Sequence, residues 1–179
     1  MRTLKAVAVA VAALAFLGAQ AMAQDARLME FGIDGGVAYD TESEITTIAL
    51  PVGTFRVGFE VSPRFALEPA FSLNRVSGDG GSITTYDLAL GMPWHFREMR
   101  SGPYVRPFVG ITGFSTSNGS SASGSQFQAG LGIGTKLPVA DSRFAWRFEG
   151  FFARGFESEP EFAASNRFGV SVGLSFFTR

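Results

Sequence analysis

The stretch FAWRFEGFF, which begins at Phe144, alternates large aromatic residues with full charges. Phe144, Trp146 and Phe148 share one parity, whereas Arg147 and Glu149 fall on the other. Because successive side chains of a β-strand point to opposite faces, one face of this strand is strongly apolar and the other is ionised. The fold must therefore offer an apolar environment to one face and a charge-pairing environment to the other.

The same alternation recurs along the rest of the chain, in segments separated by turn-like stretches. No segment after residue 23 has the length and pattern of a globular helix, and nothing suggests a second domain. The sequence therefore predicts a single all-β domain of eight strands. The expected strands are approximately 28–39, 47–61, 65–76, 83–96, 103–114, 126–137, 144–152 and 166–177.

Two kinds of irregularity are expected within these strands. The apolar phase of the second strand reverses at Pro51-Val52-Gly53, which predicts a β-bulge there. Pro69, Pro93 and Pro107 fall inside expected strands, although proline has no N–H to donate to a neighbouring strand. Each of these prolines predicts a bulge or an interrupted pairing.

The N-terminus has the three parts of a secretory signal peptide. Arg2 and Lys5 precede the apolar run 6–17, and Ala21-Met22-Ala23 forms a small-residue cleavage site. The run is shorter than the roughly 20 apolar residues that span a bilayer as a helix. We therefore predict a signal peptide at residues 1–23, cleaved near Ala23, and a mature barrel domain at residues 24–179.

Charge and cysteine content exclude several classes of function. Loss of Arg2 and Lys5 from the 15 basic residues leaves 13 against 16 acidic residues, a net charge of −3. This balance does not supply the basic face of a nucleic-acid-binding protein. The chain has no cysteine, which rules out disulfides and thiolate metal sites.

The residues on the polar parity distinguish a soluble sandwich from a membrane barrel. They are mostly Gly, Ala and Ser with scattered charges, which suits the crowded interior of a small barrel better than a solvated sheet face. The charges have both signs, so they can pair across that interior. A soluble periplasmic β-sandwich remains the alternative fold. The expected interior network consists of Asp34, Arg56, Glu60, Glu68, Arg106, Arg147 and Glu149.

Connection lengths predict an orientation with both termini in the periplasm. Short turns near Ser62, Arg97 and Pro138 would face the periplasm, and the loops 40–46, 77–82, 115–125 and 155–165 would face outward. The stretch 115–125 (STSNGSSASGS) is expected to be a flexible, low-complexity loop. An aromatic girdle is expected at the periplasmic interface, formed by Trp94, Phe96, Tyr104, Phe144 and Trp146.

Two segments carry a resemblance to a known family. TFRVGFEVSPRFALEPAFSLN, which begins at Thr54, and GVSVGLSFF, which begins at Gly169, resemble the small eight-stranded outer-membrane barrels of Gram-negative-type bacteria, the OmpA-like and OmpX-like barrel domains. The resemblance implies an eight-stranded antiparallel transmembrane β-barrel in the bacterial outer membrane. It also implies contact with outer-membrane lipid and lipopolysaccharide, with periplasmic chaperones and with the outer-membrane assembly machinery. We expect a monomer that binds no nucleic acid.

The sequence favours a non-catalytic protein with a structural or surface-interaction role through its outer loops. The alternatives are a small pore or transport protein, if the interior charges line a path, and a lipid-modifying barrel enzyme. The only histidine, His95, has no nearby serine motif and lies toward the periplasmic side. We therefore predict no catalytic residues, no metal site and no cofactor.

Overall fold

The computed structural model describes residues 28–41, 46–78, 81–118, 120–140, 142–157 and 164–178. No helix in this part of the chain is long and apolar enough to cross a membrane. The described residues form nine strands in a single sheet. The strands are β1 (Met29–Asp40), β2 (Thr46–Ser62), β3 (Phe65–Gly78), β4 (Gly81–Gly91), β5 (Trp94–His95), β6 (Gly102–Asn118), β7 (Ser120–Pro138), β8 (Phe144–Gly155) and β9 (Ser165–Phe177).

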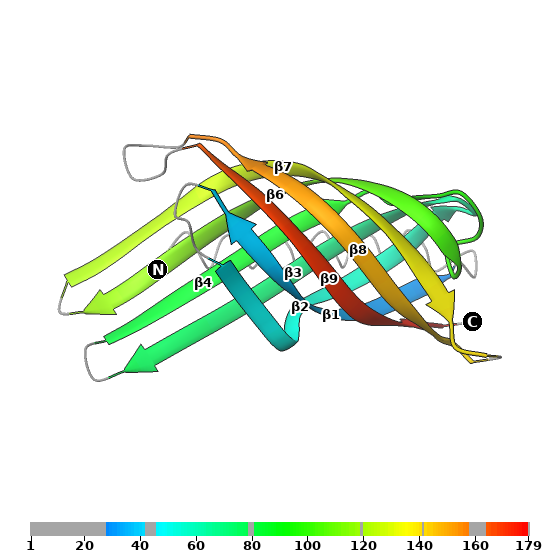
Figure 1. Cartoon of the computed structure of the whole chain (residues 1–179), viewed down its shortest axis with the longest axis horizontal. Coiled ribbons are helices and arrows are strands. Elements are labelled where there is room, and N and C mark those ends of the chain that lie inside the picture. The colour runs from blue at the N-terminus through cyan, green and yellow to red at the C-terminus, as the bar shows by residue number, and fades with distance from the viewer. Residues whose placement is uncertain are drawn as a thin grey trace.

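The sheet closes on itself because β1 pairs with β9 as well as with β2. Every other long strand pairs antiparallel with its neighbours in the chain, and β4 pairs directly with β6. The two-residue β5 fills the gap below β4, between β3 and β6. The result is a closed eight-stranded barrel with one short extra strand (Figure 1). This confirms the predicted all-β barrel, while the predicted signal peptide at residues 1–23 lies outside the described residues.

The predicted irregularities are confirmed. The register of β1 against β2 shifts between Asp34↔Thr54 and Gly36↔Ala49, so β2 bulges at the predicted Pro51-Val52-Gly53. Pro93 lies in the break between β4 and β5, and Pro107 faces the same break from β6, where its carbonyl accepts a hydrogen bond from Met92. On β3, the ladder with β2 is interrupted beside Pro69. Each proline thus lies where the absent N–H costs little pairing.

The outer surface of the barrel is apolar over most of its height. Many large hydrophobic side chains point outward and are exposed, among them Trp94, Phe96, Phe144 and Trp146 of the expected girdle. The girdle prediction is wrong for Tyr104, which is completely buried inside the barrel. Its neighbour Arg106 also points inward, so parity assigns Tyr104 to the interior despite its aromatic ring.

The predicted flexible loop 115–125 is also wrong, because its described residues, 115–118 and 120–125, belong to β6 and β7. β6 and β7 stay paired from Gly102↔Lys136 to Asn118↔Ser120. β8 pairs with β7 only as far as Gln128, so the end of the β6–β7 hairpin extends beyond the barrel wall. The β3–β4 hairpin extends beside it, and together their outer ends form a projecting sheet (Figure 1). The loop prediction failed because this stretch consists of Ser, Thr, Asn, Gly and Ala, with no apolar alternation to indicate a strand.

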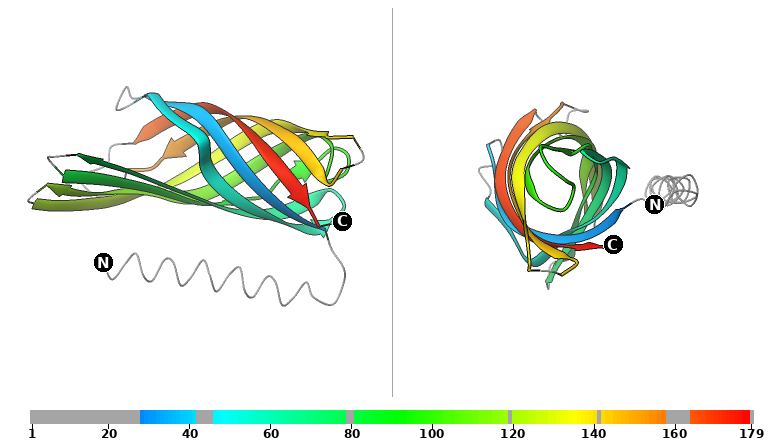
Figure 2. Two further views of the ribbon diagram at one scale, coloured as in Figure 1. Left: turned by 90° about the horizontal axis from the view of Figure 1, so that it is seen from below. Right: turned by 90° about the vertical axis from the view of Figure 1, so that its right-hand side faces the viewer.

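The two ends of the barrel differ. We call the end that holds Leu28 and Thr178 the termini end and the opposite end the loop end. At the termini end, the turn 96–101 folds back inside the ring of strands, where Figure 2 (right) shows it in green. Met99 of this turn is buried with Ala66, Ala145 and Phe177 in an apolar cluster. The turn therefore covers the inside of the barrel at this end.

Candidate functional site: the interior charge network

Arg56 on β2 holds one half of the interior. Its guanidinium donates to Glu30 of β1, to Asp34 Oδ2 at 2.7 Å and to Ser175 Oγ at 2.7 Å. A longer contact of 3.4 Å joins Arg56 Nη1 to Glu68 Oε2. The Arg56 side chain is 1% exposed, so these partners replace water almost completely.

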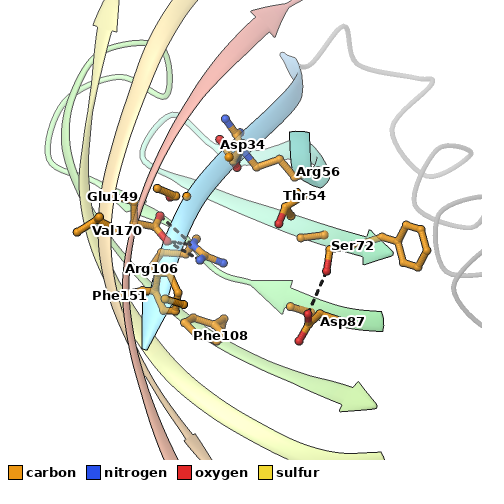
Figure 3. Close-up of a pocket in the computed structure, with 18 of the residues that line it drawn as sticks. Asp34, Thr54, Arg56, Ser72, Asp87, Arg106, Phe108, Glu149, Phe151 and Val170 are labelled. Atoms are coloured by element: carbon orange, nitrogen blue, oxygen red, sulfur yellow. Dashed lines mark hydrogen bonds and ion pairs between the residues drawn. The ribbon is translucent and has the colours of Figure 1, made fainter. Parts of the chain in front are cut away.

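Arg147 on β8 holds the other half. Its Nη1 donates to Glu68 Oε2 at 2.7 Å and its Nη2 to Glu149 Oε2 at 2.5 Å. Its Nε donates to the hydroxyl of Tyr104 at 2.6 Å, and that hydroxyl donates to Glu149 Oε2 at 2.8 Å. Arg106 of β6 completes the group through its Nη2, 2.5 Å from Glu149 Oε1 (Figure 3). Because Glu68 contacts both Arg56 and Arg147, the two halves form one network.

Lys136 of β7 joins the network to the turn at the termini end. Its ammonium group pairs with Glu30 and donates to the carbonyl of Met99 at 3.1 Å. The same nitrogen lies 5.7 Å from the centre of the Tyr104 ring. Lys136 therefore ties the buried turn to the charged interior.

The network is balanced in charge. Within the described residues, four carboxylates pair with four cations: Glu30, Asp34, Glu68 and Glu149 with Arg56, Arg106, Lys136 and Arg147. In a medium of low dielectric an unpaired charge is very costly, whereas paired and hydrogen-bonded charges are tolerated. The equal numbers leave no spare charge to attract an ion into the interior.

The structure brings together six of the seven residues that the sequence assigned to this network and separates the seventh. Glu60 lies apart, where its Oε2 accepts a hydrogen bond from the backbone N–H of Leu28 at 2.9 Å. Sequence reasoning missed Glu30, Lys136, Tyr104 and Ser175. Glu30 and Lys136 lie on the inward parity of their strands, so alternation contained the signal. Only the register across the barrel shows that they meet.

Above the network, a cavity of about 210 Å³ opens toward the loop end (Figure 3). Phe108 and Phe151 line one side of it, and Arg106 lies over the Phe108 ring at 4.7 Å. A second ion pair, Arg167 with Asp87 at 3.4 Å, crosses the cavity nearer its mouth. The cavity is therefore a blind vestibule whose floor is the network.

His95, the histidine weighed above for a lipid-modifying enzyme, is isolated from catalytic partners among the described residues. His95 is completely buried, with its ring centre 5.4 Å from that of Tyr104. Within the described part of the chain, neither of its ring nitrogens has a hydrogen-bond partner, so it activates no nucleophile there. No group of three or more His, Asp or Glu side chains in that part could hold a metal ion.

A closed antiparallel barrel with an apolar outer band and an ion-paired interior defines a small transmembrane β-barrel of the outer-membrane type. The model of the outer membrane protein beta-barrel domain family matches residues 9–176. The chain belongs to this family, and it is a protein of the bacterial outer membrane.

Two solved structures share this fold. Neisserial surface protein A aligns with a TM-score of 0.60 and 13% identity, over 83% of this chain and 96% of that one. Ail, the attachment invasion locus protein of Yersinia pestis, aligns with a TM-score of 0.51 and 13% identity, over 84% of this chain and 99% of that one. The latter structure contains the heparin analogue sucrose octasulfate. The comparison with curated proteins finds no match.

Proposed function

We propose that this protein is a monomeric, non-catalytic and non-conducting barrel that presents its projecting sheet to the outside of the cell. In this proposal residues 1–23 direct export and are removed near Ala23, and the termini end faces the periplasm. At this end only two residues separate β2 from β3, and five separate β7 from β8, as in the short periplasmic turns of such barrels. Periplasmic chaperones, the assembly machinery and outer-membrane lipid are its expected partners.

The proposal that the barrel conducts no ions rests on its closed interior. An eight-stranded barrel has room only for packed side chains, and here those side chains are locked in mutual ion pairs. A permeating ion would have to separate ion pairs that are almost completely buried. Each buried charge that loses its partner would cost several kcal/mol. The turn that holds Met99 adds a second barrier at the termini end.

Planar bilayer recording tests this part directly. The refolded protein, shown to be folded by its changed gel migration on boiling, is added to the bilayer at increasing amounts. We expect no discrete conductance steps. Steps that scale with the amount of folded protein would replace this proposal with the small-pore function.

The surface role is supported by the projecting sheet, which contributes nothing to the closure of the barrel. A trimmed variant replaces residues 115–123 with Asn-Gly, so that a two-residue turn closes the hairpin on the cross-strand pair Phe114↔Gly124. The removed residues are Ser, Thr, Asn, Gly and Ala, which offer hydroxyl and amide groups but no charge. We expect cells that display the full chain to attach to a layer of host cells better than cells that display the trimmed chain. Equal attachment, with equal amounts of folded barrel, would contradict a role for this hairpin.

A further inference from the structure

We propose that the outer surface of β8 carries a binding site for one phosphate-bearing, multi-acyl lipid of the outer leaflet, of the lipid A type. An acyl chain lies in a groove at Gly150, and a phosphate binds Arg154 at the top of the same strand. The site rests on the outer-membrane placement of the chain and on the orientation proposed above.

The groove begins with a missing side chain on the outward face. Gly150 has Ile133 of β7 and Val170 of β9 as its cross-strand partners. Ile133 is 63% exposed and Val170 is 61% exposed, more than any other exposed large hydrophobic residue in the described part of the chain. They are uncovered because no side chain stands between them.

Packing does not require a glycine at this position. A Cβ built on Gly150 would meet no atom closer than the carbonyl oxygen of Gly169, at 4.0 Å. At Gly130 on the adjacent strand, by contrast, a Cβ would lie 2.3 Å from the carbonyl oxygen of Phe152. Gly150 thus leaves open space on the lipid side, whereas Gly130 is needed for close packing.

Apolar side chains from four strands surround this space and make it a groove. The groove contains no charged side chain, so within the apolar band of the membrane it suits a hydrocarbon chain. Its lining residues are Val37, Tyr39, Leu131, Ile133, Phe152, Phe168 and Val170, together with Gly150, Phe151 and Gly169.

A cation stands above the groove on the same face. Arg154 shares the outward parity of Gly150 and lies four residues further along β8, about 13 Å toward the loop end. It is exposed and donates to Asn166 Oδ1 at 2.9 Å, and it makes no ion pair with the described residues. Two aromatic pairs flank its level, Phe152 with Phe168 and Phe127 with Phe156. Aromatic residues mark the membrane interface, so the guanidinium lies at headgroup height.

The chemistry of these two features selects the occupant. A guanidinium binds phosphate in a bidentate geometry, and an arginine at the edge of the apolar band extends toward the headgroups. A lipid with a phosphate on its headgroup and several chains can occupy both features at once. A neutral lipid would leave Arg154 unused, and a second copy of the chain would have to bury this charge.

Native mass spectrometry of the full barrel in mild detergent, with purified lipid A as the probe, tests the proposal. We expect one lipid A to be retained per barrel. Gly150→Leu, which fills the groove, and Arg154→Gln, which removes the phosphate ligand, should each lower retention about tenfold. The control for loss of charge is Arg75→Gln, because Arg75 is an outward, exposed arginine on β3 that lies in the projecting sheet and does not stand above this groove. It should retain lipid A as the unaltered chain does.

Each outcome has a defined meaning. Equal losses in Arg75→Gln and Arg154→Gln would show unspecific charge attraction and overturn the site. Equal retention of phosphatidylglycerol would overturn the choice of lipid A, and a dimer mass abolished by Gly150→Leu would assign the groove to a second copy. Gel migration with and without boiling confirms that each variant is folded. A conducting barrel would disprove the proposed function without affecting this test.

Discussion

At the scale of single residues, the interior is built from small residues placed beside large charged ones. A Cβ at Gly32 would lie 2.2 Å from Cζ of Arg56, and a Cβ at Gly132 would lie 2.6 Å from Oε1 of Glu149. The glycines on the inward parity therefore make room for the ion pairs. This explains why the polar face of each strand is rich in glycine rather than in solvated polar residues.

Arg147 is the residue whose loss should matter most for stability. Arg147→Gln leaves Glu68 and Glu149 buried with fewer cations, which should lower the free energy of unfolding by about 3–5 kcal/mol. Urea unfolding in lipid vesicles measures this value. Arg143→Gln, at an exposed turn position, should change it by less than about 0.5 kcal/mol. Similar losses of unfolding free energy for Arg147→Gln and Arg143→Gln would contradict a stabilising role of the buried ion pairs.

The glycines of adjacent strands give a second prediction at this scale. Gly130→Ala forces a Cβ against the Phe152 carbonyl and should destabilise the barrel by about 1–3 kcal/mol. Gly150→Ala meets open space, so it should be neutral or stabilise by up to about 1 kcal/mol. Unfolding in vesicles compares the two variants. A larger loss of stability for Gly150→Ala than for Gly130→Ala would contradict the assignment of open space to Gly150 and tight packing to Gly130.

The sequence predicted which side chains point into the barrel, but it did not predict which of them form ion pairs. Parity identified Arg56, Arg147 and Glu68 as inward, and the structure joins them. The Glu30–Lys136 pair joins β1 to β7, which are not adjacent in the barrel. Such a contact depends on how the barrel closes, and local alternation does not contain that information.

At the scale of elements, alternation decides which face of a strand meets lipid. Along β9, Val170 and Val172 are exposed on the outside, whereas Gly173 and Ser175 are buried. The sequence predicted the eight strands for this reason, since one face of each had to be apolar. It missed the strand character of residues 115–118 and 120–125, which are Ser, Thr, Asn, Gly and Ala and show no apolar alternation.

Two neighbouring substitutions on β9 test the assignment of faces. Val172→Arg places a charge against lipid near mid-strand and should cost about 2–4 kcal/mol. Ser171→Thr points inward, adds one methyl group and should cost much less. Both values come from unfolding in vesicles of defined thickness. Equal tolerance at the two positions would invert the inside and outside of the strand.

At the scale of the whole molecule, stability comes from the closure of the barrel. Each long strand is paired on both sides over much of its length, so the barrel wall has no free edge. Compact barrels of this kind stay folded in SDS until they are heated. The sequence predicted this closed architecture from eight amphipathic segments, but the inward fold of the turn 96–101 has no counterpart in the strand pattern.

A fractionation experiment tests the molecule as a whole. The protein should be recovered in the outer-membrane fraction, and its migration on an SDS gel should differ between boiled and unboiled samples. Arg147→Gln should lower the temperature at which the two bands interconvert, because it weakens the closed interior. A soluble protein without any shift would replace the barrel with a periplasmic sandwich.

The ion pairs also constrain the order of assembly. Glu30 on the first strand is satisfied in part by Ser175 on the last, and Arg56 on the second strand contacts the same serine. These groups lie far apart in the chain and meet only when β9 docks against β1. A chain that lacks β9 would keep the Glu30–Arg56 ion pair but would leave both groups without the hydroxyl of Ser175. The network is therefore fully hydrogen-bonded only when the seam between β1 and β9 is closed, so the interior favours a completed barrel over an unfinished one.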